Sequence, residues 1–245
     1  MENKTKYYIA GAIILAIIFI AESLAIKDTK YIWLQTRTFG LLSFLGVFLT
    51  IALGEMRLIR KSCGGFGAFK HHTKIGIASA ALVFIHMVSA IADNYKWGKQ
   101  LSFVQYLGFT FTDKWMFWLS LGTLSFYLIL IVAGLSQTKM IQKLTFQKWK
   151  LTHYLSYGAF IIAYIHAINL GTDIKISALS PYLHPLIQSM FLLVIALLIT
   201  RMLCSQSIFS DKTETNLATM FFLLLLILSL SIASQIEKKQ QDIND

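Results

Sequence analysis

Apolar residues run along this chain in long blocks rather than in the short alternating stripes that are typical of strands. Six segments contain no Asp, Glu, Lys or Arg, and a seventh contains one acid, Glu22. A helix needs about 17 to 25 mostly apolar residues to cross a bilayer. The seven segments are 7–26, 38–54, 75–92, 115–138, 151–172, 176–200 and 215–236. The pattern predicts an all-α membrane protein, a polytopic bundle of six core transmembrane helices plus a seventh.

Composition and motifs exclude several classes of soluble protein. Of the 245 residues, 56% are hydrophobic and 14% are charged, whereas soluble domains average about 25% charged residues. No nucleotide-binding glycine fingerprint is present, and Cys63 and Cys204 stand alone. The chain therefore encodes no nucleotide domain, no zinc knuckle and no covalent haem attachment.

The net charge of +10 bears on membrane sidedness rather than on nucleic acid. With a cytoplasmic N-terminus, alternating spans place 13 of the 22 Lys and Arg inside and 9 outside. The two most basic loops, 57–74 and 139–150, then both lie inside. The positive-inside rule predicts a multi-pass cell-membrane protein with a cytoplasmic N-terminus, and an outer C-terminus if 215–236 spans.

Histidine within a bilayer segment is uncommon and is a functional candidate by default. His86 and His166 lie deep in two spans that run in the same direction, and His72 and His153 lie at the cytoplasmic starts of those spans. At 1.5 Å of rise per residue, the two histidines of each span lie about 20 Å apart along the helix. A flat macrocycle with two axial imidazoles would fit between such helices, so two levels of histidine predict two haems, one near each membrane surface.

Alternatives remain at this point. Any one of these histidines could simply hydrogen-bond a neighbouring helix. His71 could exchange roles with His72, and His184 is expected at the interface. At about 100° per residue, His153 and His166 lie about 140° apart around an ideal helix. Two haem levels therefore require a bulge or rotation in this span, or haems turned relative to each other.

The two spacings are distinctive when taken together. Thirteen residues separate His72 from His86, twelve separate His153 from His166, and Trp149 shortly precedes the second pair. This resembles the ferric reductase-like transmembrane domain family, which includes the membrane cores of NADPH oxidases, metalloreductases and the haem subunit of a bacterial periplasmic methionine sulfoxide reductase system. The resemblance implies two heme b groups per chain without covalent linkage. His72 and His153 would ligate the iron of the inner haem, and His86 and His166 that of the outer haem.

The resemblance covers residues 31–203, with a first transmembrane helix in 1–30 and an extra helix and tail in 204–245. It also implies that Arg37 lies close to the outer haem. Arg57 ends its span at the inner haem level, where it could pair with a propionate. Long cations at span ends also snorkel to the interface without binding a cofactor, so both roles stay open.

The predicted function is electron transfer across the membrane by a di-haem cytochrome, an oxidoreductase subunit. The oxidases carry a C-terminal flavin and nicotinamide domain, whereas 42 residues follow Leu203 here, so a separate flavoprotein or quinol donor is expected. Loops 57–74 and 139–150 would attract an acidic flavoprotein, and loop 93–114 would face an outer-side reductase partner or small acceptor. Membrane lipid is the other expected partner, and nucleic acid is not expected.

Three other functions fit the same pattern. The first is a cytochrome b561-like quinol oxidoreductase, whose histidine pairs lie on a different set of spans. The second is a transporter or proton relay with histidine protonation sites, although only Glu22 and Glu55 add carboxylates to the spans. The third is a scaffold for the assembly of a redox enzyme. Ferric iron, oxygen, a quinone and a partner protein all remain open as terminal acceptors.

Overall fold

The computed structural model describes residues 29–63, 71–96, 101–112, 114–175 and 180–205. All regular secondary structure in these ranges is helical, as the hydropathy pattern predicts. Five helical segments are long and apolar enough to cross a membrane, so the chain is a membrane protein. The spans predicted over 7–26 and 215–236 lie outside the described residues.

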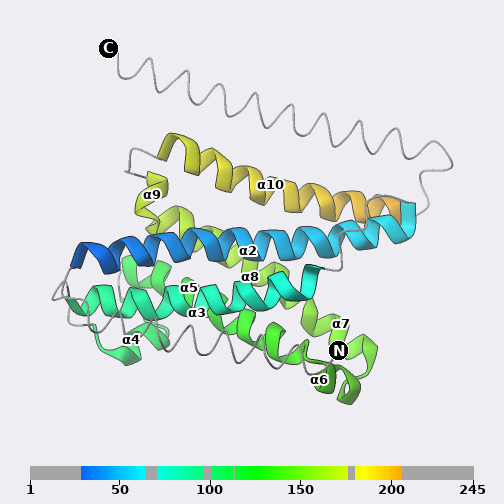
Figure 1. The fold of residues 1–245 in the computed structure, drawn as a ribbon, viewed down its shortest axis with the longest axis horizontal. Helices are drawn as coiled ribbons and strands as arrows, with labels where there is room; N and C mark the ends of the chain where they lie inside the picture. Colours follow the sequence, from blue (N-terminus) through cyan, green and yellow to red (C-terminus); the bar gives the residue numbers. More distant parts are fainter. Residues whose placement is uncertain (1–28, 64–70, 97–100, 113, 176–179, 206–245) are drawn as a thin grey trace, which may run out of the picture. The chain divides into compact units, whose positions relative to one another are not determined.

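Each of the five long segments contains most of one charge-free run. They are α2 (Thr29–Cys63), α3 (His72–Lys96), α5 (Lys114–Leu135), α7 (Phe146–His153) with α8 (Leu155–Leu170), and α10 (Ser180–Ser205) (Figure 1). The short helices between them are α4 (Phe103–Leu107), α6 (Thr138–Lys143) and α9 (Thr172–Lys175).

The chain divides into two compact units. The described part of the first comprises residues 29–47 and 73–170, and that of the second comprises 48–63, 71–72, 171–175 and 180–205. Helix α2 contributes to both units, because the division falls between Val47 and Phe48. Each unit is described by itself.

Helices α5 and α8 pack along each other in the first unit. The Ser125 hydroxyl donates a hydrogen bond to the Ala159 carbonyl, with 2.9 Å between the oxygens. Phe160 is 1% exposed and stacks on Phe44 of α2, with 5.1 Å between the ring centroids. These contacts bring three helices together in a buried interior.

Helices α2 and α3 approach closely through small residues. A Cβ on Gly46 would lie 2.5 Å from the Ser79 hydroxyl oxygen, so this position has room only for glycine. Small residues at helix contacts are typical of membrane bundles, because they let backbones come close.

A folded connection covers the first turns of α5. Ser102 begins α4 with a capping box completed by Gln105. The Thr123 hydroxyl donates to the Tyr106 carbonyl, and the Tyr127 hydroxyl donates to the Leu107 carbonyl. Burial and the charge of Asp93 raise the pKa of Tyr106, so its hydroxyl stays protonated.

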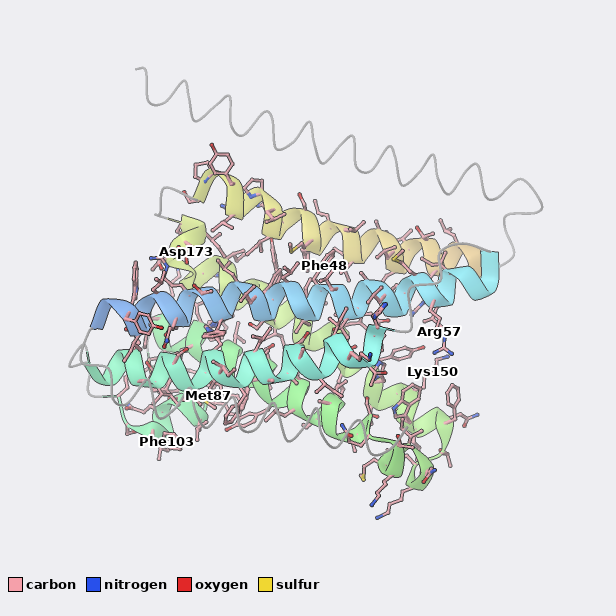
Figure 2. All side chains as sticks on the ribbon, viewed as in Figure 1. Phe48, Arg57, Met87, Phe103, Lys150 and Asp173 are labelled. Atoms are coloured by element: carbon pink, nitrogen blue, oxygen red, sulfur yellow. The ribbon has the colours of Figure 1, made fainter. Side chains whose placement is uncertain are left out.

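The basic connection after α5 lies at the opposite end of this unit. Thr145 caps α7 by accepting a hydrogen bond from the Lys148 amide. Figure 2 shows Phe103 of α4 at one end of the unit and Lys150 of α7 at the other, with Met87 of α3 toward the Phe103 end.

The second unit contains a buried ion pair. Glu55 of α2 is 0% exposed, and its Oε1 lies 2.8 Å from the Arg201 guanidinium of α10. A buried carboxylate is costly in a membrane unless a cation or hydrogen bonds compensate it. This pair therefore ties α10 to the C-terminal half of α2.

Candidate functional site

The structure brings together two of the four predicted ligands. His86 of α3 and His166 of α8 belong to the same unit, and their ring centroids lie 6.4 Å apart with an angle of 75° between the ring planes. Met87, the residue after His86, shows this level on α3 (Figure 2). Neither histidine is fully buried, although both lie well inside predicted spans.

His86 fits against a glycine and a carbonyl of α2. Its Nδ1 lies 2.9 Å from the Thr36 carbonyl oxygen. A Cβ on Gly40, four residues after Thr36, would lie 3.0 Å from the Cε1 atom of the ring. A larger side chain at Gly40 would push the imidazole away from its hydrogen-bond partner.

His166 is held in the same way by α5. Its Nδ1 lies 2.9 Å from the Trp118 carbonyl oxygen. A Cβ on Gly122, again four residues later, would lie 2.5 Å from the ring, closer than real contacts allow. We call this arrangement, a glycine with the carbonyl four residues before it, a glycine–carbonyl seat.

The two seats fix which ring nitrogen is left for a metal. A carbonyl oxygen only accepts hydrogen bonds, so Nδ1 of each ring carries the proton and donates it. The lone pair of each neutral imidazole is then on Nε2. Metal-binding histidines commonly have this second hydrogen bond, because it fixes their tautomer and orientation.

The separation of the rings fits one metal ion between them. A metal–imidazole bond is about 2 Å and the ring centroid lies about 1.1 Å beyond the nitrogen, so two imidazoles on opposite sides of one metal ion would have centroids about 6.2 Å apart. The measured separation is 6.4 Å. No group of three or more His, Cys, Asp or Glu that could hold a bare ion occurs among the described residues. Two histidines alone suit a macrocycle that supplies the other ligands.

His72, the first residue of α3, has its own seat in the second unit. Its Nδ1 lies 2.8 Å from the Thr50 carbonyl oxygen, and a Cβ on Gly54 would lie 3.3 Å from the ring. Arg57, which the sequence places at this level, lies three residues after Gly54 on α2.

His153 lies in the first unit with different neighbours. Its Nδ1 is 3.2 Å from the Ser136 hydroxyl oxygen, and its ring stacks on that of Trp149, with 5.1 Å between the centroids. The Nε1–H of Trp149 is buried and has no acceptor within the described part of the chain. His72 belongs to the second unit and His153 to the first, so the surroundings of each histidine are described by themselves.

The span that carries His153 and His166 is interrupted. An irregularity in this span is one of the alternatives that the angle of about 140° between the two histidines on an ideal helix leaves open. Helix α7 ends at His153, and α8 begins at Leu155 after a turn at Tyr154. The Tyr154 amide is shared between the carbonyls of Lys150 and Leu151, each at 3.2 Å. The two histidines therefore do not belong to one regular helix.

The remaining sequence candidates are Arg37, His71 and His184. The Arg37 guanidinium lies 3.8 Å above the Trp33 ring, one turn earlier on α2, in a cation–π contact. His71 and His184 are exposed.

The glycines were missed in the sequence, although a signal for them is present. Paired positions on antiparallel helices have a constant sum of residue numbers. Gly40 with His86 and Gly54 with His72 give the same sum, 126. The 14-residue spacing of the two glycines matches that of the two histidines. The histidine spacing that resembles the family predicts the ligands, but it does not include the glycines that lie against their rings.

Comparison with protein-family models, with curated proteins and with solved structures found no match.

Proposed function

We propose that the protein is a b-type membrane cytochrome that carries electrons across the membrane through two haems. The observation that supports this most is the His86–His166 pair, with a ring separation suited to one metal ion and a tautomer that presents Nε2. Haem, when bound, supplies the one-electron chemistry.

The chain's own residues hold and orient the cofactor in this proposal. Gly40 and Gly122 leave room for the imidazoles, and the carbonyls of Thr36 and Trp118 hold the ring planes. The surrounding apolar helices exclude water, which favours electron transfer over side reactions.

The second haem rests on the sequence. His72 and His153 lie about 20 Å along the helices from the outer pair, and each has an Nδ1 partner in its own unit. In this proposal they bind the inner haem, with Arg57 near a propionate.

The direction of transfer follows from the charge distribution. Lys139, Lys143, Lys148 and Lys150 are all exposed in and around α6 and α7, and this segment has no acid. We place this end in the cytoplasm, where an acidic flavoprotein would dock, with a quinol as the other donor considered. Electrons would leave near α4 to an acceptor on the outer side.

Haem counting on ligand variants tests this proposal. The purified full chain should contain about two haems by the pyridine haemochrome assay. His86→Leu and His166→Leu should each lower this count to about one, because a haem that loses one of its two histidines would no longer be retained, while the distant inner site acts independently. His71→Leu and His184→Leu are the matched controls and should keep both haems. A wild-type chain without haem would overturn the proposal.

A further inference from the structure

Three of the four predicted ligands share one kind of hydrogen-bond partner, and the fourth does not. His72, His86 and His166 each donate from Nδ1 to a backbone carbonyl in a glycine–carbonyl seat, at 2.8 to 2.9 Å. His153 instead faces the hydroxyl of Ser136 at 3.2 Å. The only glycine near it on α5, Gly134, has no atom within 4 Å of a built Cβ and so holds no ring.

The ends of two helices explain this exception. Helix α5 packs against α7 as well as α8, and Ser136 meets His153 at the C-terminal end of α7. Helix α5 ends at Leu135, and Ser136 is the next residue. The Ser136 amide still bonds to the Val132 carbonyl at 3.0 Å, which anchors the serine at the helix end.

The His153 ring is well fixed between two groups. Trp149, one turn earlier on α7, stacks on it with 25° between the ring planes. Ser136 meets its Nδ1 from α5. A change at Ser136 therefore alters the hydrogen bond while the stacking on Trp149 still orients the ring.

A hydroxyl acts on a histidine differently from a carbonyl. The longer distance makes it a weaker acceptor, and a serine hydroxyl is itself able to rotate and donate. An acceptor on Nδ1–H makes the imidazole a more basic ligand, which stabilises the oxidised metal. Hydrogen bonding of this kind is one of the means by which a protein sets a haem potential.

We propose that Ser136 is a positioning residue that sets the reduction potential of the inner haem through His153. This inference rests on the proposed function, because it assumes that His153 ligates a haem. It assigns to Ser136 a role that none of the ligand assignments contains.

The test is a spectroelectrochemical titration of the full chain with both haems bound. Ser136→Ala removes the acceptor, so the inner haem should become easier to reduce while the outer haem stays unchanged. Loss of one hydrogen bond should change the equilibrium constant for electron transfer between the two haems by at most about tenfold. This corresponds to a shift of at most about 59 mV in the reduction potential of the inner haem. Ser136→Thr keeps the hydroxyl and should keep the wild-type potential.

A matched control separates tuning from stability. Ser125→Ala also removes a serine hydrogen bond between α5 and α8, the one to the Ala159 carbonyl, but it touches no histidine. It should lower thermal stability and leave both potentials in place. If Ser136→Ala loses the inner haem, Ser136→Cys provides a weaker acceptor of similar size, and its inner potential must lie above that of wild type.

The outcomes distinguish the two proposals. Two haems with unchanged potentials in both Ser136→Ala and Ser136→Cys would overturn the role of Ser136 and leave the cytochrome intact. A chain that binds no haem would overturn the proposed function itself.

Discussion

A glycine that faces an imidazole is a specific residue-scale feature of this protein. Helix interiors usually disfavour glycine, by about 1 kcal/mol relative to alanine. Here Gly40, Gly54 and Gly122 each lie beside a histidine ring that a Cβ would crowd. Glycine therefore lowers the helix propensity at these positions, but it leaves the space that each imidazole ring occupies.

Gly122→Leu should displace His166 and abolish the outer haem. The first added carbon would lie 2.5 Å from the ring, and the ring would have to leave the Trp118 carbonyl. The haem content should fall from about two to about one per chain, measured by the pyridine haemochrome assay.

Gly158→Ala is the control for this substitution. Gly158 lies on α8, the helix of His166, and a Cβ there would meet nothing within 4 Å. This variant should keep both haems and gain slightly in helix stability. Equal haem loss in both variants would show that the seat has no special role.

At the scale of the helices, the sequence predicts the spans well and their details poorly. Charge-free runs located α3, α5 and α10, because burial in lipid excludes charges over a full span. The same runs underestimated α2, which continues through Arg37 and Arg57 to Cys63, since charges at span ends do not break a helix. The depth of the four histidines along their spans could be computed from the helix rise per residue.

The site beyond its ligands depends on contacts between helices. The phase of His153 and His166 indicated an irregularity, but the position of the turn at Tyr154 depends on local hydrogen bonding. Which glycine meets which histidine depends on helix register, and register is set by packing such as Gly46 against Ser79. A single sequence does not show these long-range contacts directly.

Arg201→Leu should destabilise the protein strongly. It removes the cation that faces the buried Glu55 carboxylate, and breaking a buried pair costs about 3–5 kcal/mol. Denaturant unfolding in detergent micelles would measure the loss. Adding Glu55→Gln to this variant should recover much of it.

Thr200→Ala is the matched control, because it removes only a hydrogen bond within α10, to the Ala196 carbonyl. Its free energy of unfolding should change by less than about 1 kcal/mol. A similar loss in Arg201→Leu and Thr200→Ala would contradict a stabilising role for the ion pair.

For the whole molecule, the prediction concerns which side of the membrane each loop faces. The basic loops 57–74 and 139–150 are expected in the cytoplasm. An impermeant thiol reagent should therefore leave native Cys63 unlabelled in intact cells and label it after permeabilisation.

Thr112→Cys in a chain lacking the native cysteines is the positive control, because this exposed residue lies in the predicted outer loop. It should be labelled in intact cells. Labelling of Cys63 in intact cells would reverse the topology and the direction of electron flow.

In the proposed cytochrome, His86 and His166 would be the two histidine ligands of one haem. Electron paramagnetic resonance of the oxidised full chain tests this, because ferric haem held by two imidazoles is low-spin. Ring planes near the observed 75° should give a strongly anisotropic low-spin signal. We predict that this signal is present in wild type and absent in both His86→Leu and His166→Leu, while a second low-spin signal remains. A spectrum without low-spin haem, or one that neither substitution changes, would contradict the account.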